Sequence, residues 1–142
     1  MGTEPHDELT ESIIGCAIRV HRRMGAGLLE GAYDHFLCHE LSKNGLMVRR
    51  QTALPATYDG VTFDLGYRPD IIVNGEAIVE VKAVASLLPI HTAQLITYLS
   101  LSGIRRGLLI NFHADPLVKG IKRVVLTSDH QSVSFLDDQN HQ

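Results

Sequence analysis

Apolar residues recur at steps of three and four through residues 8–24, a spacing that places them on one face of a helix. A glycine-rich segment, 25–27, ends this pattern, because glycine readily adopts the backbone angles that follow a helix. A second helix is predicted over 28–43 and is closed by an Asn-Gly pair. Gly31 lies inside this second helix, where glycine costs ~1 kcal/mol relative to alanine. We therefore expect close packing around Gly31.

The middle of the chain changes to short runs rich in β-branched residues, separated by Asp-Gly and Asn-Gly turn signals. The candidate strands are 46–52, 56–58, 61–66, 68–73 and 76–83. Helical spacing returns over 90–102, and the apolar run 107–112 predicts a strand buried on both faces. Residues 121–127 form the last predicted strand.

The order of these elements predicts the fold class. The part of the chain from 76 to 112 has the pattern of a β-α-β crossover, which joins two parallel strands through a helix. We therefore expect an α/β fold with a central mixed β-sheet flanked by helices. Residues 1–142 are expected to form a single domain, with loose ends at 1–7 and 137–142.

Composition agrees with a soluble globular domain, since 44% of the 142 residues are hydrophobic and 20% are charged. The longest apolar run is well short of the roughly 18 residues that span a membrane, and the polar, acidic start does not resemble a secretory signal. Cys16 and Cys38 lie among apolar helical positions, without a C-x-x-C motif. We interpret them as buried thiols in a reducing cytoplasm; a disulfide is possible but nothing supports it. No membrane partner is expected.

The overall charge is slightly acidic, with 13 basic against 16 acidic residues and a net charge of −3. Nucleic-acid-binding proteins usually carry a basic surface, so any such contact must come from local patches. Four groups of basic residues are candidates, although each alone also fits ordinary solvated surface. They are Arg22 with Arg23, Arg49 with Arg50, Arg105 with Arg106, and Lys119 with Lys122 and Arg123.

The strongest chemical signal is a carboxylate and an amine on one apolar strand. Glu80 and Lys82 are two residues apart, so both side chains lie on the face that also carries Ile78. Burying the two charges without partners would be unfavourable, so the pair needs a reason. A catalytic site and a cross-strand ion pair on a solvated sheet face fit this spacing about equally well.

Asp70 joins this pair only if the turn near Asn74 has an odd length. A plain two-residue turn would place Asp70 opposite Val79, with its side chain on the other face from Glu80. A three-residue loop, 73–75, would place Asp70 opposite Ile78, with Glu80 as its diagonal neighbour at roughly 7–8 Å. We predict the odd-length loop or a bulge.

Such a set would suit divalent-metal chemistry. The carboxylates of Asp70 and Glu80 are hard oxygen ligands of the kind that Mg²⁺ or Mn²⁺ prefers. An ion held there could activate water, and Lys82 could orient that water and stabilise negative charge on a phosphate.

Two helical segments could complete the site. His91, Gln94 and Tyr98 share one face of the helix at 90–102, where Gln94 could hold a phosphate or position Lys82, with Tyr98 in support. His91 is a poor candidate for a metal ligand, and the three residues also fit a helix interface. Glu30 and Tyr33 lie one helical turn apart; Glu30 could add a third carboxylate, or could simply favour the helix N-terminus.

The residues Gly27, Glu30 and Tyr33 match a G-x-x-E-x-x-Y signature, and the chain resembles the small bacterial proteins of the GxxExxY family. The similar segments are LTESIIGCAIRVHRRMGAGLLEGAY, YRPDIIV, IVEVKAV, PIHTAQLITYL and GLLINF. That family is grouped with the PD-(D/E)XK nuclease superfamily, so the resemblance implies a restriction-endonuclease-like fold.

The resemblance also implies roles for particular residues. Asp70, Glu80 and Lys82 would be the signature residues, and Glu30 the acidic residue on a helix. Gln94 and Tyr98 resemble the Q-x-x-x-Y motif of the exonuclease-like branch.

Three functions remain open on the sequence. The leading hypothesis is metal-dependent phosphodiester hydrolysis, with DNA favoured over RNA as the substrate. The second is a non-catalytic module that binds nucleic acid or a protein, which the acidic charge and small size favour somewhat. The third is a structural subunit whose apolar helix faces form a homodimer.

Overall fold

The computed structural model describes residues 7–64, 66–127 and 133–137. The first predicted helix is confirmed as α1 (Glu8–Met24), and the second as α2 (Glu30–Lys43). Asp7 caps α1, because its carboxylate accepts the backbone N–H of Thr10 at 2.7 Å. The expectation of a loose start is therefore wrong for Asp7, whereas 1–6 and 138–142 lie outside the described residues.

The main sheet contains six strands in the order β1-β4-β5-β6-β7-β8. Only β5 and β6 are parallel, and every other neighbouring pair is antiparallel. The strands are β1 (Val48–Arg50), β4 (Ile71–Val73), β5 (Ala77–Lys82), β6 (Arg106–Asn111), β7 (Ile121–Leu126) and β8 (Val133–Asp137). Helix α3 (Pro89–Ser102) joins β5 to β6, which confirms the predicted crossover and the mixed α/β sheet. A short 3₁₀-helix, Leu117–Gly120, precedes β7.

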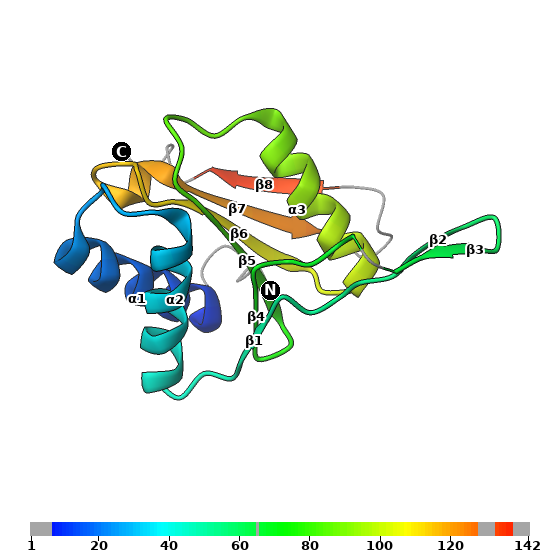
Figure 1. Ribbon diagram of the computed structural model, residues 1–142, viewed down its shortest axis with the longest axis horizontal. Helices are drawn as coiled ribbons and strands as arrows, with labels where there is room; N and C mark the ends of the chain where they lie inside the picture. The colour runs from blue at the N-terminus through cyan, green and yellow to red at the C-terminus, as the bar shows by residue number, and fades with distance from the viewer. Residues whose placement is uncertain (1–6, 65, 128–132, 138–142) are drawn as a thin grey trace.

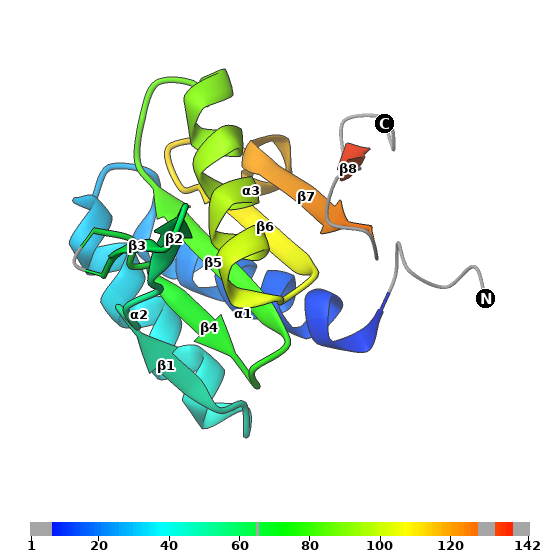
Figure 2. The same ribbon diagram turned by 90° about the vertical axis from the view of Figure 1, so that its right-hand side faces the viewer.

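Helices cover both faces of this sheet: α1 and α2 lie on one side, and α3 lies on the other (Figures 1 and 2). Alternate residues of β5 supply the two cores, because successive strand side chains point to opposite faces. Val79 packs with α1 and α2, whereas Ile78 packs with Leu95 and Leu99 of α3. Strand β6 is buried from Gly107 onward, as its apolar run predicts. This packing places even-numbered residues of β5 under α3.

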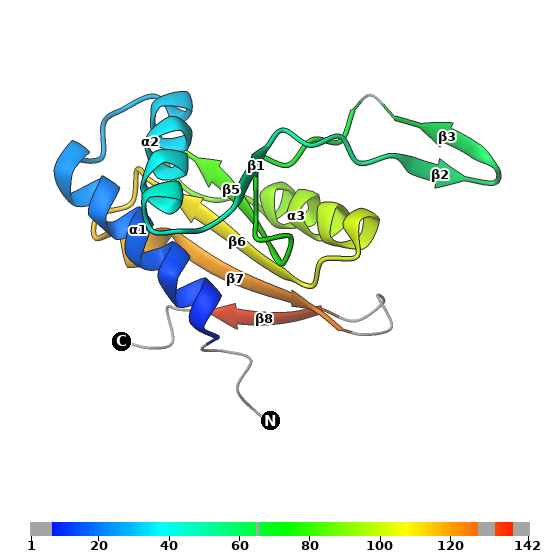
Figure 3. The same cartoon turned by 90° about the horizontal axis from the view of Figure 1, so that it is seen from below.

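A separate hairpin, β2 (Ala56–Tyr58) and β3 (Val61–Phe63), projects away from the body of the protein (Figures 1 and 3). Its large side chains are exposed, with Tyr58 84% accessible.

Several expectations need correction. The strands expected at 46–52, 61–66 and 68–73 are shorter in the structure, and β8 was not expected. The close packing expected at Gly31 is wrong, since a Cβ placed there would meet no atom within 4 Å. Cys16 is buried as expected, but Cys38 is only half-buried, and both thiols are free. Among the described residues, no helix combines the length and apolar character needed to cross a membrane.

Candidate active site

The turn between β4 and β5 decides where Asp70 lies. Asn74 and Gly75 both have positive φ angles, 55° and 67°, and the N–H of Glu76 donates to the Val73 carbonyl at 2.9 Å. This is the geometry of a tight hairpin turn that Asn-Gly favours, followed by one extra residue. Because the loop is therefore 74–76, its length is odd, as predicted.

The register differs from the expected one by two residues. Ile71 pairs with Val79 and Ile72 with Ile78, so the same register carried one residue further places Asp70 opposite Glu80. The expected position of Asp70 opposite Ile78 is wrong, because the sequence suggested the loop 73–75. The consequence favours a common site, since directly opposed residues are closer, at about 4.5–5.5 Å, than diagonal ones.

Asp70 and Glu80 are joined through backbone groups. The Asp70 N–H donates to Glu80 Oε2 at 2.6 Å, and the Val81 N–H donates to Asp70 Oδ2 at 2.8 Å. These two bonds extend the cross-strand connection to the residue just before the start of β4. They leave Glu80 Oε1 without a hydrogen-bond donor among the described residues, while Asp70 Oδ1 meets only Gln51 Nε2, at 3.4 Å.

Burial disfavours negative charge at both carboxyl groups. Glu80 is only 5% exposed, and burial together with the neighbouring Asp70 raises its pKa to about 8. Burial is also the main cause that raises the pKa of Asp70, with a smaller contribution from Asp34. Bonds from backbone N–H groups and the charge of Lys82 act in the opposite direction on both pKa values. A proton or a nearby cation would therefore stabilise this pair near neutral pH.

Lys82 and Tyr98 lie close enough to this pair to influence it. Lys82 is half-buried at the end of β5, on the same strand face as Glu80. The pKa of Tyr98 on α3 is raised by burial first, and then by the charges of Glu80 and Asp70. The strand and the helix thus bring these four residues to one region.

Gln94 and His91 have different surroundings. Gln94 is exposed on α3, and its side chain forms no hydrogen bond with another described residue. His91 accepts the backbone N–H of Leu88 at 3.0 Å through Nδ1, so it caps the start of α3.

Comparison with protein families gives a decisive match. The profile of the PD-(D/E)XK nuclease superfamily matches residues 7–124, which is most of the chain. The chain belongs to the PD-(D/E)XK nuclease superfamily. Searches of curated proteins and of solved structures gave no significant match. The family match covers the β4–β5 hairpin and α3, which together carry the candidate site.

Two other expected members of this PD-(D/E)XK site, Glu30 and Tyr33, lie on α2. Glu30 is the exposed first residue of α2, and its charge contributes to the raised pKa values of Asp70 and Glu80. Tyr33 is fully buried: its hydroxyl donates to the Gly25 carbonyl at 2.6 Å and accepts the Leu28 N–H at 2.9 Å. Tyr33 therefore stabilises the segment that connects α1 to α2, and its hydroxyl forms no hydrogen bond with the carboxylate pair.

The sequence reasoning missed an ion pair beside the PD-(D/E)XK site. Asp34 is buried on α2, and its Oδ1 accepts from Nη2 of Arg50 on β1 at 2.8 Å. Asp34 lies four residues after Glu30, so helical spacing could have suggested it. Nothing in the sequence pattern pointed to Gln51, which has a φ of 54° and donates its backbone N–H to the Asp70 carbonyl at 3.2 Å.

The donor set bears on a metal ion. Within the described ranges, no three or more His, Cys, Asp or Glu side chains are arranged to hold a metal. Glu30 is thus not part of a three-ligand group with Asp70 and Glu80. The two opposed carboxylates are chemically suited to Mg²⁺ or Mn²⁺, because both ions prefer hard oxygen ligands. A bound cation would also compensate the negative charge that burial disfavours at Glu80.

Proposed function

We propose that this protein is a divalent-metal-dependent nuclease that hydrolyses phosphodiester bonds. The observation that supports this most is the opposed pair of Asp70 and Glu80, two neighbouring carboxyl groups whose surroundings disfavour negative charge and would favour a bound cation. Membership of a nuclease superfamily gives the reaction class. Within that superfamily we assign the chain to the GxxExxY family, on the signature at Gly27, Glu30 and Tyr33.

Each residue has a proposed part in the reaction. Asp70 and Glu80 would hold Mg²⁺ or Mn²⁺, with Glu30 adding negative charge from α2. The ion would supply Lewis acidity at the scissile phosphate. Lys82 would orient the attacking water and stabilise developing negative charge, since it lies on the same strand face as Glu80.

Two residues of α3 would serve the substrate. Gln94 would contact a substrate phosphate, because its exposed side chain is uncommitted among the described residues. Tyr98 would support the carboxylate pair, to which its pKa is electrostatically linked.

We propose DNA rather than RNA as the substrate, and the whole of 1–142 as one functional domain. A cytoplasmic location agrees with the two free thiols. A homodimer is compatible with the small size, and light scattering would test it.

A nuclease assay with matched variants tests the proposed reaction. Purified protein is incubated with Mg²⁺ or Mn²⁺ and with labelled single- and double-stranded DNA and RNA. Glu80→Gln and Lys82→Ala should each abolish cutting, while Glu76→Gln, an exposed glutamate in the turn, should leave it unchanged. The proposal fails if the wild-type protein cuts none of these substrates, or if Lys82→Ala cuts as well as wild type.

A non-catalytic binding module is the second candidate. The specific observation in its favour is that both carboxylates already accept backbone N–H groups, so they also act as structural links between β4 and β5. Calorimetric titration with Mn²⁺ separates the two functions. Tight binding that Asp70→Asn removes supports the nuclease, and no Mn²⁺ binding by the wild-type protein supports the binding module.

A further inference from the structure

A second region of concentrated charge lies away from the nuclease site, between the C-terminal half of α1 and the facing part of α2. The two helices enclose a cavity of about 410 Å³, within the range of small-molecule binding sites. None of its lining residues belongs to the Asp70–Glu80 site, and it lies on the opposite side of the sheet from α3.

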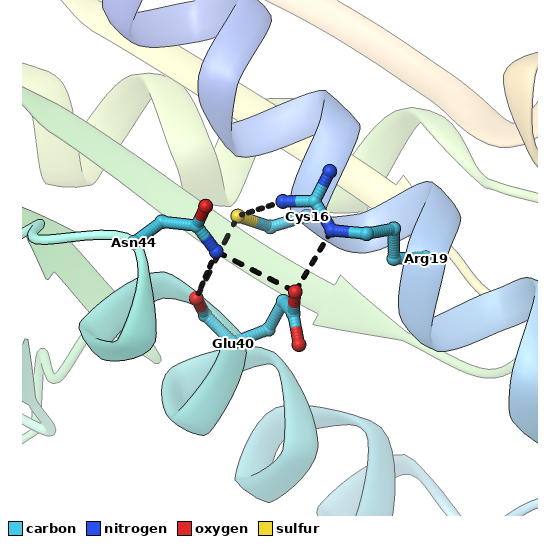
Figure 4. Close-up of polar contacts among 4 residues, drawn as sticks. All are labelled: Cys16, Arg19, Glu40 and Asn44. Atoms are coloured by element: carbon cyan, nitrogen blue, oxygen red, sulfur yellow. Dashed lines mark hydrogen bonds and ion pairs between the residues drawn. The ribbon is translucent and has the colours of Figure 1, made fainter.

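On one wall of the cavity, a positive and a negative side chain compensate each other's charge. Arg19 Nε donates to Glu40 Oε2 at 2.8 Å, and Arg19 Nη2 lies 3.3 Å from Cys16 Sγ (Figure 4). Asn44 Nδ2 donates to the Glu40 backbone carbonyl at 2.8 Å. The bond from Arg19 is the main cause that lowers the pKa of Glu40. Glu40 is the cavity's single carboxylate among its described lining residues, and Arg19 already compensates its charge.

Three further cations line the same cavity. Arg22 and Arg23 come from the last turn of α1, and Lys43 comes from the last turn of α2. The side chains of Arg22 and Arg23 form no hydrogen bond or ion pair with another described residue. Basic residues in a last turn also favour the helix dipole. The helix dipole does not explain why cations of two separate helices line the same cavity. Their grouping is also unexpected in a protein whose net charge is −3.

The rest of the cavity wall consists of His39 and three apolar residues. Phe36 and Met24 are 37% and 41% exposed although both are large hydrophobic side chains, and Val20 beside them is buried. Apolar walls with a few charged groups are the usual composition of sites for small organic ligands. The arrangement complements a ligand with an anionic end and a flat apolar end.

We propose that this α1–α2 cavity is a nucleotide-binding site, separate from the nuclease site. Arg22, Arg23 and Lys43 bind the phosphate, and the base packs against Phe36 and Met24. The nucleotide is either free in solution or the terminal unit of a nucleic acid strand. The proposal does not rest on the nuclease function, because the two sites share no residue.

Binding is measured on the full chain by calorimetry in EDTA, with AMP, inorganic phosphate and a 5′-phosphorylated single-stranded oligonucleotide as probes. The double variant Arg22→Gln/Arg23→Gln should lose at least about tenfold in affinity for AMP, because charged hydrogen bonds are lost. Both arginines are exposed, so the fold should persist, and circular dichroism checks this. The control Arg49→Gln removes one exposed positive charge on β1, outside the cavity, and should bind like wild type.

Further measurements distinguish binding of the base from binding of the phosphate, and a free nucleotide from a strand end. Phe36→Ala should weaken AMP binding and leave phosphate binding unchanged. Binding of AMP without the oligonucleotide supports a free nucleotide, and binding of the oligonucleotide that the double variant removes supports a strand end. The proposal is overturned if AMP and the oligonucleotide both fail to bind, if AMP binds no more tightly than phosphate, or if the double variant matches wild type.

Discussion

Asp70 and Glu80 lie opposite each other just before the start of β4, and the Asp70 N–H donates to Glu80 Oε2 at 2.6 Å. The Val81 N–H in turn donates to Asp70 Oδ2, so the two carboxylates connect the strands where backbone pairing stops. Glu80 is buried and Asp70 is half-buried beside it, so burial raises the pKa of both groups, and the charge of Asp70 raises the pKa of Glu80 further.

Divalent ions should stabilise the folded protein through this pair. Adding Mn²⁺ should raise the melting temperature of the wild-type protein, because an ion that binds only the folded state stabilises it by mass action. Glu80→Gln removes one charged ligand and should abolish the increase, whereas Glu76→Gln should preserve it. Calorimetric melting curves with and without Mn²⁺ measure both effects. An equal increase in Glu80→Gln and wild type would contradict the proposed ligands.

Without metal, stability should fall as the pH rises from about 4.5 to about 8. Folding raises the pKa of Glu80 from an ordinary 4.5 to about 8, so the folded state binds its proton more tightly than the unfolded chain does. The free energy of unfolding is therefore greatest below the lower value and decreases through this window. The raised pKa of Asp70 acts with the same sign. Urea denaturation in EDTA across this pH range should show the decrease, and a clearly smaller decrease in Glu80→Gln.

The signature residue Tyr33 should matter for stability rather than for chemistry. Tyr33→Phe removes the bonds to Gly25 and Leu28 and should lower the free energy of unfolding by about 1–2 kcal/mol. Tyr58→Phe is the matched control, since Tyr58 is 84% exposed, and it should have no effect. Urea denaturation measures the change. Loss of nuclease activity in a still folded Tyr33→Phe protein would instead place Tyr33 in the reaction.

Substitutions of two polar residues of α3 should have different effects, one on activity and the other on stability. Gln94→Ala should reduce cutting without changing stability, because its side chain is exposed and forms no hydrogen bond with another described residue. His91→Ala should lower stability by about 0.5–1 kcal/mol through loss of the cap on α3. Parallel activity and denaturation measurements on both variants check this. If His91→Ala reduced cutting and Gln94→Ala reduced stability, the proposed roles of the two residues would be reversed.

Glycine substitutions should test the packing around α2 and β7. Gly31→Ala should stabilise the protein by about 0.5–1 kcal/mol, because the position is helical, exposed and open. Gly120→Ala should destabilise it, since a Cβ there would lie 2.5 Å from the Asn111 carbonyl oxygen. Thermal melting distinguishes the two. A destabilised Gly31→Ala protein would restore the close packing that the sequence suggested.

The sequence by itself determined the helices and the pairing of Glu80 with Lys82. The bounds of α1 followed from apolar spacing, because a periodic pattern reports which face of an element is buried. Strand parity alone placed Glu80 and Lys82 on one face, and it needed no knowledge of the neighbouring strand. The apolar run of β6 similarly indicated a strand buried on both faces.

Only the tertiary structure decided which other residues lie beside Glu80 and Lys82. The Asn-Gly turn indicated where β4 and β5 reverse, but the extra residue Glu76 shifted Asp70 from Ile78 to Glu80, because register depends on the whole hairpin. The Asp34–Arg50 pair and the cavity between α1 and α2 arise from helix packing between segments far apart in the chain. Local spacing describes one element at a time, and these contacts depend on how separate elements pack together.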